Sequence, residues 1–200
     1  MDRIPCNGEA AALFRGILQR ADGVLLVPTE TVYGLVCDAA HEAARAKIYE
    51  IYEMKRRPAS KLLTLFFASL QAAEAAFPEM PETAKRIAAA FCPGPVTLVV
   101  PDGEAFTGFR IPDHPALLRL LEAYGRPLAS TSANLSGQQP PHTVDEALES
   151  LAMPPDGALD GGPIPPDSAA STVIKVERNG TWSILRPGPV SEEMLRAALA

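Results

Sequence analysis

Three positively charged side chains lie close together in the first third of the chain: Lys55, Arg57 and Lys61. Arg57 precedes Pro58, and the residue before a proline is restricted to extended backbone. Cationic groups held at such a rigid turn can clamp phosphates. A solvated helix end, stabilised by the helix dipole by about 0.3–1 kcal/mol per charge, has the same sequence pattern. Taken alone, the cluster favours the helix end over a phosphate site.

A second polar group follows a predicted buried strand. Residues 130–134 are Ser-Thr-Ser-Ala-Asn, and three hydroxyls and an amide in five residues are an unusual choice for packing. Such a loop can line an anion or sugar site. For this motif, a functional interpretation is at least as well supported as a structural one.

Two further turns carry polar groups that suit a small anionic ligand. Residues 28–34 offer hydroxyls and backbone N–H groups after a predicted strand, although an ordinary turn between strands has the same composition. Arg186 ends another predicted strand just before a Pro-Gly-Pro turn, where it is placed for a phosphate or for a surface salt bridge. The sequence has no G-x-x-x-x-G-K-[ST], no G-x-G-x-x-G and no G-x-S-x-G. An enzyme that acts on nucleotides would therefore use cations and backbone amides here.

These residues must be positioned by alternating helices and strands. Apolar spacing and turn signals predict helices over residues 9–21, 41–56, 69–77, 82–91, from a cap at Asp113 to Gly125, after Thr143, and after Ser191. Strands are predicted over residues 24–27, 35–37, 62–67, 96–100, 106–111, from 127 onward, 171–177 and 181–185. Residues 153–170 are rich in Pro, Gly and Asp, which predicts a loop. The pattern predicts one α/β domain, residues 1–200, with a mixed sheet.

The composition limits the class of protein. The chain has 200 residues, a net charge of -6 and 47% hydrophobic residues, which excludes a mainly disordered chain. No apolar run approaches the ~20 residues of a membrane span, and the first residues lack the features of a signal peptide. The three cysteines form no C-x-x-C, so we expect neither a disulfide framework nor a metal site, and we expect a cytoplasmic location. The negative charge disfavours a protein that mainly coats nucleic acid.

Taken together, the motifs resemble the YrdC/TsaC family of threonylcarbamoyl-AMP synthases. The matching motifs occur in the order found in that family and span nearly the whole chain; they are residues 28–35 (PTETVYGL), 55–58, 93–97 (PGPVT), 110–115, 132–137 (SANLSG), 171–174 and 185–189. The chain differs from the family pattern at Phe66, where some members have a histidine, and over residues 106–109. It resembles the short members, which lack an additional C-terminal domain, so we expect a shorter loop to close the site, with residues 161–170 as the candidate.

The resemblance implies a twisted, open mixed sheet flanked by helices. It also implies synthesis of threonylcarbamoyl-AMP and pyrophosphate from L-threonine, bicarbonate or CO2 and ATP with Mg²⁺, for the t6A modification of tRNA by t6A-transfer proteins. By similarity, the residues that contact threonine are Thr31, Arg110, Ser130 and Ser171. Those that contact the nucleotide are Arg57, Lys61, Ser132, Asn134 and Arg186, and the catalytic pair is Lys55 and Arg57.

Two alternatives share this fold. One is a carbamoyl-adenylate-forming relative without threonine specificity, such as the YrdC-like domain of hydrogenase maturation proteins. The other is an RNA-binding YrdC-like protein, whose affinity for RNA would fall steeply with salt.

Overall fold

The computed structural model describes residues 2–5, 10–51, 63–134 and 140–200. The strands are β1 Asp2–Pro5, β2 Val24–Val27, β3 Gly34–Asp38, β4 Thr64–Phe66, β5 Val96–Asp102, β6 Ala105–Arg110, β7 Leu128–Ser132, β8 Gly157–Asp160, β9 Thr172–Val176 and β10 Trp182–Arg186. The helices are α1 Ala10–Leu18, α2 Glu42–Ile51, α3 Leu70–Ala76, α4 Glu82–Phe91, α5 Pro115–Tyr124, α6 Val144–Glu149 and α7 Glu192–Leu199. Within the described ranges, no helix is long and apolar enough to cross a membrane.

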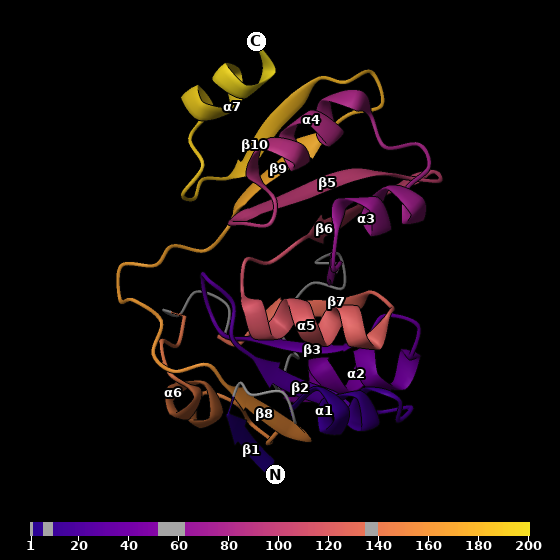
Figure 1. Ribbon diagram of the computed structural model, residues 1–200. Helices are drawn as coiled ribbons and strands as arrows, with labels where there is room; N and C mark the ends of the chain where they lie inside the picture. Colours follow the sequence, from indigo (N-terminus) through magenta and orange to yellow (C-terminus); the bar gives the residue numbers. More distant parts are fainter. Residues whose placement is uncertain (1, 6–9, 52–62, 135–139) are drawn as a thin grey trace.

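All the strands join one sheet in the order β1-β8-β2-β3-β7-β4-β6-β5-β9-β10 (Figure 1). The sheet is mixed, because β4 pairs with β6 and β5 with β9 in parallel, while β3–β7, β7–β4 and β6–β5 are antiparallel. β1 and β10 lie at opposite edges, so the sheet is open. The predicted fold class is confirmed.

Helix ends follow local capping rules. Thr143 and Ser191 cap α6 and α7 with their hydroxyls, as predicted. Gly125 ends α5 in the left-handed region with φ of 72°, where glycine has no steric cost. The predicted cap at Asp113 is wrong, because His114 occupies that position and its ring accepts a hydrogen bond from the N–H of Leu117.

One face of the sheet is covered along its length. Register places Leu26, Leu35 and Ala129 on this face, where they pack against α2 and α6. Phe109 and Leu98 continue it and pack beneath α3, α4 and α7. These layers bury most of the apolar side chains, which is the main stabilising contribution to the fold.

The opposite face is covered over only part of the sheet. α1 and α5 pack on the side chains of β2, β3 and β7 that alternate to this face, with Phe66 of β4 at the margin of that cluster. Past Phe66, the partly buried residues on this face are Thr64, Gly108, Val99 and Val173, and the buried ones include Arg110 and Thr97. An area of sheet lined by small side chains is therefore left beside the helices.

Two strands were absent from the sequence prediction. β8 lies within residues 153–170, where a loop was expected, and β1 pairs with it at the sheet edge. β8 is four residues long and follows two prolines, so its local signal is weak. Its pairing with β2 and the burial of Ala158 and Leu159 stabilise it. The strand that begins near residue 128 also continues to Ser132, so the hydroxyl motif is partly strand rather than loop.

Candidate functional site

The sheet gathers polar side chains from distant parts of the sequence at the boundary of the uncovered area. Arg110 ends β6, Thr31 lies in the turn between β2 and β3, and Ser130 lies in β7. Ser171 immediately precedes β9, and Arg186 ends β10. All but Arg186 are at most about 5% exposed, so these polar groups are held within the protein rather than on its surface.

Arg110 is the central group of this site. Its Nη2 donates a hydrogen bond of 2.9 Å to Oγ1 of Thr31, which is 79 positions away in the sequence. Its Nε donates one of 3.3 Å to the carbonyl of Gly94. Nη2 also lies 2.7 Å from Oε1 of Glu30. A guanidinium with only 6% of its side chain exposed, fixed by these neighbours, is preorganised to bind a carboxylate.

The turn that carries Thr31 is held by its own hydroxyl groups. Thr29 Oγ1 accepts hydrogen bonds from the N–H of Thr31 at 3.1 Å and of Val32 at 3.0 Å, and donates one of 2.7 Å to the carbonyl of Val32. The hydroxyls of Thr29 and Thr31 lie 2.9 Å apart and share a further hydrogen bond. Glu30 therefore projects from a turn that is fixed on both sides.

A second cationic group lies near Arg110. Arg186 donates hydrogen bonds from Nη2 to the carbonyl of Ser171 at 2.9 Å and to its hydroxyl at 3.2 Å. The Ser171 hydroxyl in turn lies 2.8 Å from Oγ1 of Thr97. Burial, and then the positive charge of Arg110, lower the pKa of Arg186. Two guanidiniums that repel each other electrostatically favour binding of an anion between them.

The hydroxyl motif of β7 borders the same region. Ser130 is 3% exposed and pairs across the sheet with Thr64. Ser132 is exposed and pairs with Gly34, and Asn134 follows it, partly buried. A Cβ at Gly34 would lie 2.9 Å from the carbonyl oxygen of Thr131, so only glycine allows this close approach of the two backbones.

The segment of residues 161–170 passes between the two ends of the molecule (Figure 1). The Tyr33 hydroxyl donates a 2.7 Å hydrogen bond to the carbonyl of Gly162, and the N–H of Ile164 donates one of 2.7 Å to the carbonyl of His142. At the far end, the N–H of Thr172 bonds to the carbonyl of Pro95. This segment therefore joins the Thr31 turn to the Ser171 strand, at the positions that flank Arg110.

Three predicted site residues, Lys55, Arg57 and Lys61, lie outside the residues that the structure describes. The sequence analysis missed Glu30 and Thr97. Glu30 had a recognisable signal, since it is a lone acid between two threonines in a motif already selected. Phe66 is buried in the core beneath α1 and α5, so its side chain belongs to the packing of this face.

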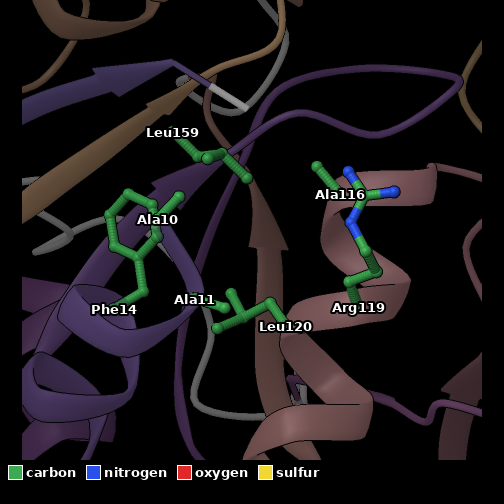
Figure 2. A pocket seen from close by; sticks show the side chains of 7 residues that line it. All are labelled: Ala10, Ala11, Phe14, Ala116, Arg119, Leu120 and Leu159. Carbon is green, nitrogen blue, oxygen red and sulfur yellow. The ribbon is translucent and has the colours of Figure 1, made fainter. Parts of the chain in front are cut away.

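Two other features of the structure do not provide a substrate site. An apolar cavity of about 50 Å³ between α1 and α5 holds at most a few water molecules, far less than the ~300 Å³ or more of ligand pockets (Figure 2).

Among the described residues, no group of three or more His, Cys, Asp or Glu is arranged to hold a metal ion.

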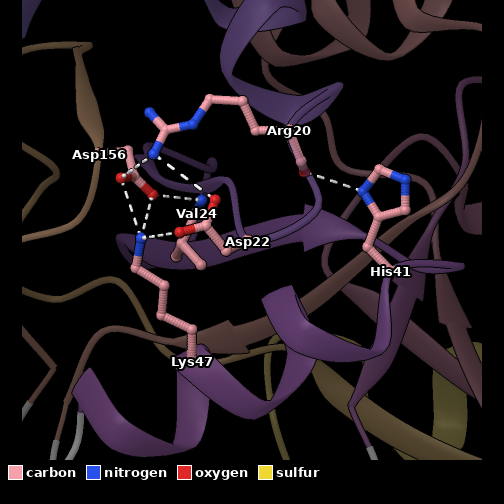
Figure 3. Close-up of polar contacts among 6 residues, drawn as sticks. All are labelled: Arg20, Asp22, Val24, His41, Lys47 and Asp156. Carbon is pink, nitrogen blue, oxygen red and sulfur yellow. Dashed lines mark hydrogen bonds and ion pairs between the residues drawn. The ribbon is translucent and has the colours of Figure 1, made fainter.

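The second feature is an ion-pair cluster that joins α2 to the start of β2 and to the segment before β8 (Figure 3). The Asp156 carboxylate accepts hydrogen bonds from Lys47 Nζ at 2.9 and 2.8 Å and from the N–H of Val24 at 2.8 Å. Burial acts to raise the pKa of Asp156, but these bonds and the charges of Lys47 and Arg20 outweigh it and leave the pKa lowered. The cluster therefore contributes to the stability of the fold.

Comparison with known proteins agrees with this architecture. Residues 18–188 match the family Sua5_yciO_yrdC, described as Telomere recombination. The threonylcarbamoyl-AMP synthase of Bacillus subtilis is 34% identical over 98% of this chain and 57% of its own length. That of Stenotrophomonas maltophilia is 38% identical over 71% of this chain and 81% of its own.

The crystal structure of P. abyssi Sua5 complexed with L-threonine matches with a TM-score of 0.87 and 30% identity, over 99% of this chain and 60% of that chain. The chain belongs to the Sua5/YciO/YrdC family, as its motifs predict. It spans a little over half the length of the first curated relatives it matches, which are the Bacillus and Pyrococcus synthases.

Proposed function

We propose that this chain synthesises threonylcarbamoyl-AMP from L-threonine, bicarbonate or CO2 and ATP, with release of pyrophosphate. The observation that carries the proposal is the buried Arg110 guanidinium with Thr31 on one side and the Ser171–Arg186 pair near it. The likeness to a Sua5 structure complexed with L-threonine and to curated threonylcarbamoyl-AMP synthases supports the choice of substrates.

Threonine binding is assigned to the buried polar groups. Arg110 binds the α-carboxylate, because its planar group pairs with a carboxylate through two parallel hydrogen bonds. Thr31, Ser130 and Ser171 supply hydroxyl groups within the same region, where water does not compete for them. The sheet and the turns at its strand ends fix all four residues, so threonine is oriented as it binds.

Nucleotide binding is assigned to the more exposed edge of the site. Arg186, Ser132 and Asn134 are the described residues assigned to it, and the resemblance to the family adds the cationic motif of Lys55, Arg57 and Lys61. Mg²⁺ would accompany the triphosphate, held chiefly by phosphate oxygens, as this ion is held in many nucleotide sites. Bound Mg²⁺ supplies charge neutralisation for the phosphates.

The reaction joins anionic groups. The threonine ammonium loses a proton, and the resulting amine adds to CO2 and releases a second proton to give a carbamate. A carbamate oxygen then bonds to the α-phosphorus of ATP as pyrophosphate leaves. The carbamate, the carboxylate and the triphosphate repel one another, so the protein must neutralise charge and align the groups. Arg110 and Arg186 neutralise charge among the described residues, and Lys55 and Arg57 are the proposed catalytic pair.

The proposal extends to the use of the product. An adenylate of this kind is an activated acyl donor, and tRNA and the t6A-transfer proteins are its proposed acceptors. A cytoplasmic location is part of the same proposal, supported by the free thiols of Cys37 and Cys92.

The experiment that tests the proposal is pyrophosphate release from ATP with bicarbonate and Mg²⁺, with and without L-threonine. We expect threonine-dependent release and a product with the mass of threonylcarbamoyl-AMP. Arg110→Met should lower kcat/KM for threonine by about 100-fold or more, since a charge-assisted pair is lost in a buried site. Arg196→Met is the matched control, because Arg196 on α7 has an exposed side chain that forms a salt bridge with Glu192 and lies over the ring of Trp182.

Other outcomes separate the alternatives. Release that does not depend on threonine would indicate a carbamoyl-adenylate-forming relative. No release from a folded protein, together with RNA affinity that falls steeply with salt, would indicate the RNA-binding alternative. Equal activity of the Arg110→Met and Arg196→Met variants would remove Arg110 from the site.

A further inference from the structure

Glu30 carries a carboxylate whose surroundings leave it incompletely satisfied. Its side chain is 19% exposed, and both carboxylate oxygens are shielded from solvent. Arg110 Nη2 lies 2.7 Å from Oε1, yet neither oxygen accepts a well-oriented hydrogen bond from any residue that the structure describes. One cation therefore faces a group that can accept about four hydrogen bonds.

A buried carboxylate without hydrogen-bond donors lowers the free energy of unfolding unless a ligand supplies those donors. A buried carboxylate loses its hydration, and buried polar groups in native proteins almost always have hydrogen-bond donors. The neighbouring hydroxyls are already engaged, since Thr31 Oγ1 accepts from Arg110 and contacts Thr29 Oγ1. A molecule that binds next to Arg110 is placed to supply the missing donors.

We infer that Glu30 binds the α-ammonium group of the amino-acid substrate while Arg110 binds its α-carboxylate. This inference rests on the proposed function, and it assigns to Glu30 a role in substrate specificity. The ammonium and carboxylate of an α-amino acid are carried on the same carbon atom, and Glu30 and Arg110 are likewise in direct contact. The Glu30 carboxylate, the Arg110 guanidinium and the ammonium and carboxylate of the substrate then form a ring in which each charged group contacts groups of opposite charge.

An ammonium group is a better hydrogen-bond donor to Glu30 than a hydroxyl group. It presents N–H donors together with a positive charge, which a carboxylate with two unsatisfied oxygens requires. A hydroxyl donates one hydrogen bond and leaves the charge uncompensated. The fixed turn around Thr29 holds Glu30 in position, so little ordering is needed when the substrate binds.

The test is a cycle of one substitution and one ligand change, measured by calorimetric binding. The ligands are L-threonine and 2,3-dihydroxybutanoate of matching stereochemistry, in which a hydroxyl replaces the amine. The proteins are the unaltered chain and Glu30→Gln, which keeps the shape of the side chain and removes its charge. We expect the unaltered chain to prefer threonine by about 10- to 150-fold, and Glu30→Gln to reduce the preference to about threefold or less.

A purely structural role gives a different result. If Glu30 only positions Arg110, Glu30→Gln weakens both ligands by the same factor, because both carry the carboxylate, and the inference is overturned. Threonine binding that is absent from the unaltered chain overturns the proposed function and this inference together. If Glu30→Gln does not fold, Glu30→Asp replaces it in the cycle. Retraction of the carboxylate by one methylene should then reduce the threonine preference, and an unchanged preference contradicts the inference.

Discussion

The pair formed by Arg110 and Glu30 should make the two side chains strongly interdependent in stability. Arg110 has 6% and Glu30 19% of its side chain exposed, and their charged atoms are 2.7 Å apart. Removal of one partner leaves the other charge buried without its counter-ion, which typically costs about 3–5 kcal/mol. When both charges are removed, no unpaired charge remains in the site. The double variant should therefore lose less free energy of unfolding than the sum of the losses of the two single variants.

The magnitude follows from the contacts. Arg110→Met also removes hydrogen bonds to Thr31 and the Gly94 carbonyl, but Thr31 retains its contact with Thr29. We expect a loss of about 3–4 kcal/mol of unfolding free energy for Arg110→Met, toward the lower end because Glu30 is partly exposed. For a chain of this size, this loss corresponds to a fall in Tm of roughly 6–16 °C.

The assay is urea denaturation of the unaltered chain, Arg110→Met, Glu30→Gln and the double variant. We expect a coupling free energy of about 2 kcal/mol or more. The free energy of unfolding of the double variant should then be equal to or higher than that of the less stable single variant. The matched control is the exposed pair of Arg196 and Glu192 on α7, which should couple by less than about 0.5 kcal/mol. Additive losses at Arg110 and Glu30 would refute the argument that their charges depend on each other.

Three further predictions concern other parts of the molecule. ATP should raise the Tm of the unaltered chain by roughly 5–11 °C at about 100 times its Kd, and Arg186→Met should lose most of this shift; an equal shift in both would exclude Arg186 from nucleotide binding. Burial and a hydrogen bond to Asp38 raise the pKa of Tyr124, so the hydroxyl favours folding below about pH 10 and this contribution declines as the pH rises further. Tyr124→Phe should cost about 1.5–3 kcal/mol at neutral pH and show a smaller alkaline decline in urea denaturation, and an unchanged decline would contradict the assignment. Burial raises the pKa of Cys37 to about 12 and of Cys92 to about 11, so in a variant without the third cysteine both thiols should react with iodoacetamide at pH 8 far more slowly when folded than in urea. Comparable rates in the two conditions would show that these thiols are exposed.

Much of the local structure can be predicted because its signals are local. The spacing of apolar residues predicts α4 and β2 with the observed bounds, and the hydroxyls of Thr143 and Ser191 define the start of two helices. The family can also be recognised from sequence, because its motifs lie at the turns where glycine, proline and charged residues are required. The predicted helix over residues 41–56 is confirmed as α2 over its described part, and its end lies outside the described residues.

The strands β1 and β8, which lie side by side at one end of the sheet, could not be predicted in this way. β8 consists of Gly157 and three following residues, and a segment that short has no reliable periodicity of its own. It is a strand because β2 pairs with it and because Phe14 and Ile17 pack closely against Gly157. Pairing and packing of this kind are properties of the assembled sheet.

The sequence alone determined which residue types are available for chemistry: the hydroxyl and cationic motifs, and the order of the strands and helices that carry them. The tertiary structure decided which of these groups meet. Arg110 contacts Thr31 across 79 residues, and Thr97 contacts Ser171 across 74, because strand register brings them to neighbouring positions. It also decided that the partly buried Glu30 contacts Arg110, which no spacing in the sequence indicates. The reason is that helix and turn preferences depend on adjacent residues, whereas burial and charge pairing depend on contacts made only after the sheet has formed.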